Sequence, residues 1–314
     1  MMPRTLRERV LVTGATGFVG RQLPAALATN GLEVHAVGHR ASAAPEVLAF
    51  ATWHQADLLD ASATAALIRE VRPTILVHAA WYVVHGRFWA APENEAWLEA
   101  STELAAHFAE AGGRRLVGLG SCAEYAATAE GDDTPWPETR PLLPATPYGR
   151  AKATFAERLG AMAKKRNHLS VVWARLFHLF GPAEATARLV PSVVAALLEG
   201  RPALRGSGSP VRDFASTWFT ADAIAALTAS DVVGAVNVAS GIPHSIGSIA
   251  TKIATILHRQ DLLETGALPD RPNEVRFMVA DTTRLRDEVG FKKVAPLAAD
   301  LKRIIELTLQ EMKG

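Results

Sequence analysis

Residues 9–20, RVLVTGATGFVG, join a short apolar run to a helix-like segment through three closely spaced glycines. A pyrophosphate can lie at a helix N-terminus only where the backbone approaches it closely. Gly14 permits the tight turn, Gly17 the close approach, and Gly20 the close packing of helix on strand. An ordinary glycine turn is the alternative, but this context favours a dinucleotide-binding loop. The residues expected to contact the dinucleotide here are Thr13, Gly14, Thr16, Gly17, Phe18, Val19 and Gly20.

Apolar runs and helix-like segments alternate from this loop to about residue 180. Buried parallel strands read as continuous apolar runs, and the runs in this chain have that form. We predict strands at 9–13, 33–37, 52–55, 74–79, 115–119 and 170–176. We predict helices at about 18–29, 61–70, 94–111, 147–165 and 297–312. This alternation indicates an α/β fold with a doubly wound parallel (Rossmann) sheet.

Proline and glycine punctuate this pattern. Pro24 lies inside the first predicted helix, where an interior proline is costly, so we expect a kink or a later helix start. Beyond residue 180 the elements become short and irregular. We therefore expect a cofactor-binding domain over residues 1–180. A smaller α/β substrate-binding region should cover residues 181–314, with the chain crossing back between the two.

Composition and charge exclude several classes of protein. The 314 residues are 49% hydrophobic and 21% charged, and 33 Lys and Arg against 32 Asp and Glu give a net charge of +1. A nearly neutral balance disfavours a nucleic-acid partner bound through a basic surface. A single cysteine excludes an internal disulfide and a cysteine-based zinc site, and no other metal-ligand spacing is present. Neither a membrane span nor a signal peptide is evident, so we expect a soluble cytoplasmic protein.

The end of the second predicted strand bears on the choice of cofactor. An NAD site usually has an acidic residue here that binds the ribose 2′-hydroxyl, but residues 37–40 read VGHR. Gly38 leaves room, and Arg40, together with His39, can meet a 2′-phosphate. A solvated surface arginine is the alternative. We predict a preference for NADP(H), with NAD(H) possible.

Tyr148 and Lys152 lie four residues apart, which places both on one face of the predicted helix. A phenol has a pKa of about 10, and a nearby ammonium lowers it, so Tyr148 could exchange a proton with a carbonyl oxygen. Ser121 ends the fifth predicted strand, where an open α/β sheet places its ligands. It could hold the substrate oxygen against Tyr148. An exposed helix pair and a turn serine are the alternatives.

Taken with these residues, the chain resembles the extended short-chain dehydrogenase/reductases, in the NAD(P)-dependent epimerase/dehydratase group that acts on nucleotide sugars. The resemblance covers nearly the whole chain. Its motifs occur in family order as residues 13–20, Asp57-Leu58, His78-Ala79-Ala80, Ser121, Tyr148 with Lys152, Arg175, Phe180-Gly181-Pro182, Arg212-Asp213-Phe214, Asn237 and Arg271-Pro272.

The resemblance implies a role for each matched position. Ser121, Tyr148 and Lys152 would form the catalytic set, and the last two would also touch the cofactor. Further cofactor contacts would come from Asp57, Leu58, His78, Ala79 and Ala80. Substrate contacts would come from Trp81, Tyr82, Cys122, His178, Arg212 and Arg271. Packing is the alternative for both aromatic residues, and a small buried side chain is the alternative for Cys122.

The sequence departs from the family pattern in three places. The acid of the second strand is missing, which suits a reductase that consumes NADPH. Cys122 and Ala123 stand where 4,6-dehydratases need an acid/base pair, so dehydration is disfavoured. Glu124 is one position further on, and its direction cannot be read from sequence. His178 replaces the usual asparagine; it could titrate near neutral pH and act as a second acid/base, or only contact the substrate.

These features look most like those of reductases acting on 4-keto-6-deoxy nucleotide sugars. We therefore hypothesise NADPH-dependent reduction of a nucleotide-linked 4-ketohexose. A nucleotide-sugar epimerase is the nearest alternative, and a non-catalytic NADP-sensing protein is a more distant one. The resemblance also implies a homodimer in which the helices at about 94–111 and 148–165 pair. Their apolar residues, which could instead face the sheet, include Trp97, Leu104, Phe108, Phe155, Leu159 and Met162.

Overall fold

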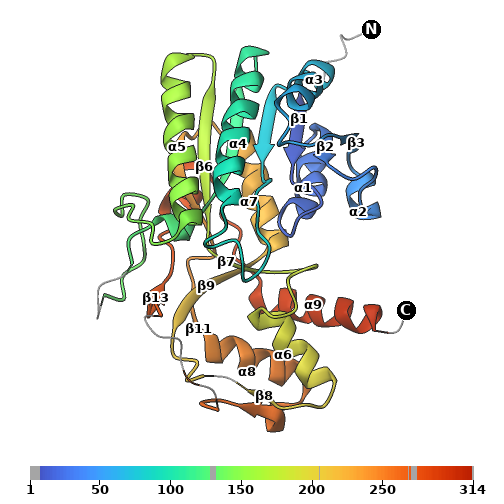
Figure 1. Cartoon of the computed structure of the whole chain (residues 1–314). Helices are drawn as coiled ribbons and strands as arrows, with labels where there is room; N and C mark the ends of the chain where they lie inside the picture. Colours follow the sequence, from blue (N-terminus) through green and yellow to red (C-terminus); the bar gives the residue numbers. More distant parts are fainter. Residues whose placement is uncertain (1–7, 128–131, 205, 268, 270–273, 313–314) are drawn as a thin grey trace.

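A seven-stranded parallel sheet forms the centre of the computed structural model, which describes residues 8–127, 132–204, 206–267, 269 and 274–312 (Figure 1). The strand order is β10-β6-β5-β4-β1-β2-β3. The strands are β1 (Arg9–Thr13), β2 (Glu33–Gly38), β3 (Thr52–Gln55), β4 (Ile75–His78), β5 (Arg115–Ser121), β6 (Ser170–Leu176) and β10 (Gly234–Val238). This confirms the predicted Rossmann-type sheet. The six predicted strands are present, and the seventh comes from the C-terminal half of the chain.

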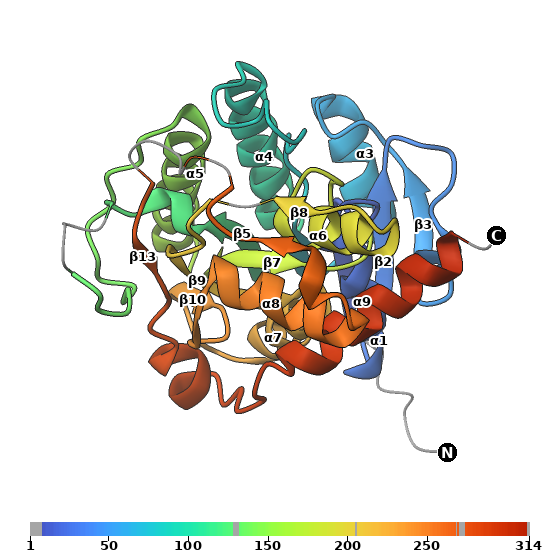
Figure 2. The same cartoon turned by 90° about the horizontal axis from the view of Figure 1, so that it is seen from below.

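Helices cover both faces of the sheet, as Figure 2 shows from below. One face carries α1 (Leu23–Thr29) and α7 (Thr217–Ala229). The other face carries α3 (Ala61–Val71), α4 (Glu93–Glu110) and α5 (Pro147–Lys165). Because apolar side chains of the sheet are buried on both faces, its strands need no polar alternation.

The first helix begins at Leu23, which confirms the later start predicted from Pro24 as the alternative to a kink. A short 3₁₀ turn, η1 (Gly20–Gln22), precedes α1, and Pro24 lies in the first turn of the helix. Proline is tolerated there because the first-turn N–H groups have no partner inside the helix. Gly14 has φ +67°, and a Cβ on it would lie 2.7 Å from the backbone nitrogen of Ala80. A side chain at Gly14 would therefore collide with the backbone of Ala79 and Ala80, which directly follow β4.

The apolar residues expected at a dimer interface lie inside the subunit instead. Leu104, Phe108, Phe155, Leu159 and Met162 are buried in the core between α4, α5 and the sheet, and Trp97 packs partly buried against it. The outer surface of these helices carries an ion pair between Arg158 and Glu99 at 2.8 Å. These residues therefore provide no evidence for a two-fold interface.

A second, smaller group of elements lies at the carboxyl ends of the central strands (Figures 1 and 2). Its main sheet contains β7 (His178–Phe180), β9 (Val211–Ser216), β11 (Pro243–Ser245) and β13 (Phe277–Met278). The strands β8 (Ala203–Leu204) and β12 (Leu263–Glu264) form a separate pair. The helices are α6 (Leu189–Leu198), α8 (Ile246–Leu257) and α9 (Leu297–Glu311). The remaining short elements are α2 (Pro45–Leu48), η2 (Cys122–Glu124), η3 (Gln260–Leu262) and η4 (Arg284–Glu288).

Among the described residues, no helix combines the length and the apolar composition that crossing a membrane requires. Among the same residues, no group of three or more His, Cys, Asp and Glu side chains is arranged to hold a metal ion.

Candidate active site

Ser121 and Tyr148 meet at the carboxyl end of β5. Ser121 caps η2: its Oγ accepts the backbone N–H of Ala123 at 3.2 Å, and Glu124 Oε1 accepts the N–H of Ser121 at 2.7 Å. Tyr148 lies in the first turn of α5, whose start is fixed by Pro147 and by Thr146, which accepts the N–H of Gly149. Accepting the bond from Ala123 does not use the hydroxyl proton of Ser121, so the hydroxyl can still act as a donor.

The phenol of Tyr148 is enclosed. Its ring contacts the rings of Phe88 and Trp89 edge-on, with centroids 4.9 and 5.7 Å apart. Burial raises the pKa of Tyr148, and a hydrogen bond with Ser121 partly opposes that shift. Tyr148 is therefore protonated at neutral pH and can donate its proton.

Lys152 lies one turn further along α5 and is 3% exposed. Its Nζ donates to the carbonyl oxygen of Leu119 at 2.8 Å, and burial lowers its pKa to about 7. We expected its ammonium to lower the pKa of Tyr148. In the structure desolvation of the buried phenol dominates and raises that pKa, so the net shift is opposite to the expected one.

Glu124 is a buried structural residue rather than a free acid. Its carboxylate is fully buried and accepts hydrogen bonds from Arg175 Nε at 2.8 Å and from Trp173 Nε1 at 3.0 Å. Together with the bond from the Ser121 N–H, these contacts occupy the Glu124 carboxylate, whose direction could not be read from the sequence. Arg175 is one of the motif residues named in the sequence, and its positive charge on a buried strand was the feature that could have indicated an acidic partner. Glu124 therefore fixes the backbone of Ser121.

The predicted cofactor residues on β1 and β4 use their side chains to join the two strands. Thr13 Oγ1 lies 2.9 Å from His78 Nδ1 and accepts the N–H groups of Ala79 and Ala80, each at 3.2 Å. His78 Nε2 lies 2.9 Å from Ser101 Oγ. Burial, and then the charge of Lys152, lower the pKa of His78 to about 3, so the ring is neutral. These contacts hold the glycine loop against β4.

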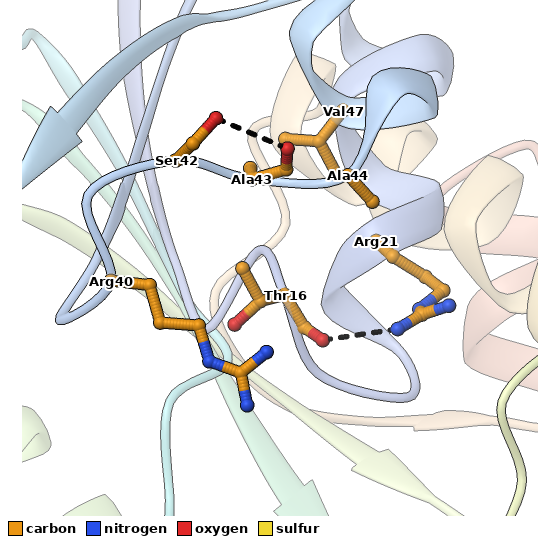
Figure 3. A pocket seen from close by; sticks show the side chains of 7 residues that line it. All are labelled: Thr16, Arg21, Arg40, Ser42, Ala43, Ala44 and Val47. Atoms are coloured by element: carbon orange, nitrogen blue, oxygen red, sulfur yellow. Dashed lines mark hydrogen bonds between the residues drawn. The ribbon is translucent and has the colours of Figure 1, made fainter.

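A cavity of about 310 Å³ lies between the glycine loop and the segment that follows β2 (Figure 3). Arg40 extends into it, and Arg21 donates to the carbonyl oxygen of Thr16 at 3.2 Å. Its other lining residues are Ser42, Ala43, Ala44 and Val47. None of the described residues lining it carries a carboxylate, and two carry a positive charge, of which Arg21 also pairs with Glu46 at 3.6 Å. The cavity is therefore suited to an anionic group.

Of the predicted cofactor residues, only Thr16 and Arg40 line this cavity, and those outside it include His39, Asp57 and Leu58. His39 is exposed, and its carbonyl oxygen accepts a bond from Gln55 at 3.1 Å. Asp57 accepts the N–H of Leu59 at 3.0 Å, and Leu58 is buried in the core against α3. Of His39 and Arg40, only Arg40 contributes to the anion-binding cavity.

The predicted substrate residues divide into two groups. Trp81 is buried over Lys152, and Tyr82 packs partly buried against the same core, which favours the packing alternative for both. Cys122 lies close to Arg212; burial raises the pKa of its thiol to about 12, and the arginine opposes that shift. Arg212 is 5% exposed and pairs with Glu274 at 3.0 Å. The predicted Arg271 lies outside the described residues.

His178 does not behave as an acid/base that titrates near neutral pH. Burial, followed by the charges of Arg212 and Arg188, lowers its pKa to about 3, which disfavours the titrating alternative and leaves that of a substrate contact. Its Nε2 is buried, and no hydrogen-bond partner for that atom was found among the described residues. Arg188, held by Glu184 at 2.8 Å, was not identified from the sequence, although the two lie four residues apart. His178 therefore lies close to Arg188 and Arg212, and each of these arginines is paired with a glutamate.

The chain is similar to several known proteins. The model of the NAD dependent epimerase/dehydratase family matches residues 10–239. The chain is 30% identical over 311 residues to a dTDP-6-deoxy-L-talose 4-dehydrogenase (NAD(P)(+)) of Kitasatospora kifunensis, covering 92% of each chain. It is 28% identical over 313 residues to a UDP-glucose 4-epimerase of Mycolicibacterium smegmatis, covering 95% of this chain and 97% of the relative.

A solved structure shares the fold over nearly the whole length. It is a UDP-N-acetylglucosamine 4-epimerase from Methanobrevibacter ruminantium M1, with a TM-score of 0.86 and 23% identity. The alignment covers 98% of this chain and 99% of the other. At that identity the likeness supports the fold alone.

Proposed function

Because the chain belongs to the NAD dependent epimerase/dehydratase family, we propose that it is an NADPH-dependent reductase of a nucleotide-linked 4-keto-hexose, with a 6-deoxy sugar favoured. The observation that carries the proposal is the contact between the protonated Tyr148 phenol and Ser121, beside Lys152. The only carboxylate placed against Ser121 among the described residues, Glu124, is bound to Arg175 and is not free for elimination chemistry.

The reduction needs a hydride at C4 and a proton at the carbonyl oxygen. Bound NADPH would supply the hydride and leave as NADP⁺. Ser121 donates a hydrogen bond that orients the ketone, and Tyr148 transfers its phenolic proton to the oxygen as it gains charge. The raised pKa of Tyr148 keeps the proton in place until that charge develops. The product is a 4-hydroxy sugar.

The NADP(H) preference is supported by the Arg40 cavity. A guanidinium binds phosphate through paired hydrogen bonds, and Arg40 and Arg21 both border the space beside the glycine loop. Thr16 and Ser42 add hydroxyl groups to the lining. An acidic side chain, which would repel a 2′-phosphate, is absent from the described lining. The 2′-phosphate of NADP(H) is therefore the group that this cavity suits.

We assign a nucleotide diphosphate to the group formed by His178, Arg188 and Arg212, where it would compete with Glu184 and Glu274 for the two guanidinium groups. Arg212 and Arg188 provide guanidinium groups, and neutral His178 provides a buried nitrogen that can accept or donate a hydrogen bond. The 30% identical relative acts on a dTDP-linked 6-deoxy sugar at C4, by its name, and uses NAD(P)⁺. Its reaction run backwards is a 4-keto reduction, which supports the proposed chemistry.

The test supplies purified protein with 4-keto sugars linked to CDP, GDP, UDP or dTDP, and follows NADPH absorbance at 340 nm. The expected result is stoichiometric NADPH oxidation with one linkage preferred, and an alcohol at C4 of the product.

The second candidate is a nucleotide-sugar 4-epimerase, which the 28% identical relative favours. An epimerase would retain its nicotinamide cofactor through purification and interconvert a UDP-hexose without net NADPH use. Retained NAD, together with such interconversion, would replace the reductase proposal. Assembly as a homodimer stays a prediction, to be measured by light scattering.

A further inference from the structure

The indole of Trp81 covers the ammonium of Lys152. Lys152 Nζ lies 3.9 Å from the centroid of the Trp81 ring and 5.8 Å from that of Trp173. Trp81 and Lys152 are 7% and 3% exposed. The negative face of an indole attracts a cation, and the attraction strengthens when water is excluded. Trp81 therefore contributes electrostatically at a position that sequence analysis assigned to the substrate.

Few other groups favour the charged form of Lys152. An ammonium has three N–H donors, and within the described residues the acceptor found for them is the carbonyl oxygen of Leu119, at 2.8 Å. Burial lowers the pKa of Lys152, and the charge of Glu124 from η2 acts in the opposite direction. His78 of β4 is neutral, and Tyr148 on the same helix is protonated. The Trp81 ring is thus a principal stabiliser of this cation.

Asn94 holds Trp81 in that orientation. Trp81 Nε1 donates to Asn94 Oδ1 at 2.9 Å, and Asn94 Nδ2 donates to the carbonyl oxygens of Phe88 and Ala91 at 2.7 and 2.9 Å. Asn94 is 1% exposed, and all three bonds are internal. Since Phe88 also contacts Tyr148, one buried amide fixes the aromatic groups that cover both Tyr148 and Lys152.

We propose that Trp81, oriented by Asn94, is a positioning residue that keeps the Lys152 ammonium charged and directed at the end of β5. Its kinetic consequence rests on the proposed reductase activity, but its effect on the lysine does not. Without the ring, Lys152 loses its proton at a lower pH.

The kinetic test compares Trp81→Leu, which removes the ring, with Trp81→Phe, which keeps a weaker one. Trp218→Leu is the matched control, because Arg303 lies over the Trp218 ring at the same 3.9 Å, away from Lys152. For Trp81→Leu we expect the basic limb of the kcat/KM profile to move down by about one pH unit, a tenfold loss at alkaline pH. Trp81→Phe should recover most of that loss, and Trp218→Leu should keep the wild-type profile.

Labelling gives a readout that needs no turnover. Each variant, checked by thermal unfolding, is treated with acetic anhydride between pH 5 and 10, and acetylation of Lys152 is quantified by mass spectrometry. Only the neutral amine reacts, so the pH midpoint of the initial labelling rate, scaled to its plateau at high pH in each variant, reports the pKa of Lys152. A lower midpoint in Trp81→Leu supports the proposal, even if no sugar is reduced. A midpoint that stays or rises in both Trp81 variants overturns it.

Discussion

Tyr148 is the residue on which the proposed reduction depends, because it is the protonated acid placed against Ser121. Its ring is contacted edge-on by Phe88 and Trp89. The sequence predicted both hydroxyl residues from their places at a strand end and a helix start. It could not predict that Lys152 binds the Leu119 carbonyl, since that depends on a side-chain orientation set by packing.

Replacing Tyr148 with Phe removes the proton donor and leaves the ring. We expect kcat to fall by about 10²- to 10⁴-fold, the usual contribution of a general acid, while NADPH binding stays within about threefold of wild type. Steady-state assays and fluorescence titration measure the two quantities. Tyr125→Phe is the control: its hydroxyl donates to Asn237 within a buried network, so that change should lower Tm but keep turnover. A Tyr148→Phe enzyme with wild-type kcat would exclude Tyr148 as the acid.

At the scale of elements, boundaries were predictable where local chemistry marks them. The helix α5 and strand β6 run from Pro147 to Lys165 and from Ser170 to Leu176, as predicted, because a cap residue, a proline and an unbroken apolar run mark them. For α1 the sequence left a kink or a later start open, and the later start occurs because the glycine loop continues into a 3₁₀ turn. The direction of Glu124 was unknown because its partner Arg175 lies on a strand 51 positions away.

The segment after β2 sets the expected coenzyme choice. Arg40→Ala should raise the Kd for NADPH by about tenfold or more and leave the Kd for NADH within about twofold, because the 2′-phosphate alone loses a charged hydrogen-bond partner. Isothermal titration with both coenzymes measures the change. Arg166→Ala controls for loss of a surface charge. Arg166 directly follows α5 and pairs with Glu110 at the end of α4. Equal weakening of both coenzymes by Arg40→Ala would contradict the assignment.

At the scale of the whole molecule, buried neutral imidazoles make stability depend on pH. The pKa values of His78 and His178 are lowered from 6.5 to about 3, so the unfolded chain binds these protons first as pH falls. Their contribution is complete above about pH 6.5 and is lost progressively towards pH 3. Glu184, whose pKa burial raises to about 7, acts in the opposite direction, because its protonation below pH 7 relieves a buried charge.

We therefore expect the free energy of unfolding to fall by a few kcal/mol between pH 7.5 and 4.5, with the two histidines outweighing one glutamate. Urea unfolding at the two pH values measures this loss. His178→Asn, which introduces the residue usual in the family, should lose less stability over that interval. His168→Gln changes a more exposed imidazole on the Ala109 carbonyl and should behave like wild type. Identical pH dependence in all three proteins would refute the role of His178.

The chain returns to the main sheet after residue 180, so the folding of residues before and after that point is coupled. The strand β10 and the helix α7 originate beyond residue 180, yet β10 pairs with β6 and α7 packs beside α1 in the core. Removing the residues after 180 would leave β6 as an unpaired edge strand and would expose the part of the sheet that α7 covers. An exposed edge strand promotes aggregation through pairing with other chains. We therefore predict that the segment up to residue 180 does not reach its native fold unless the residues that follow it are present.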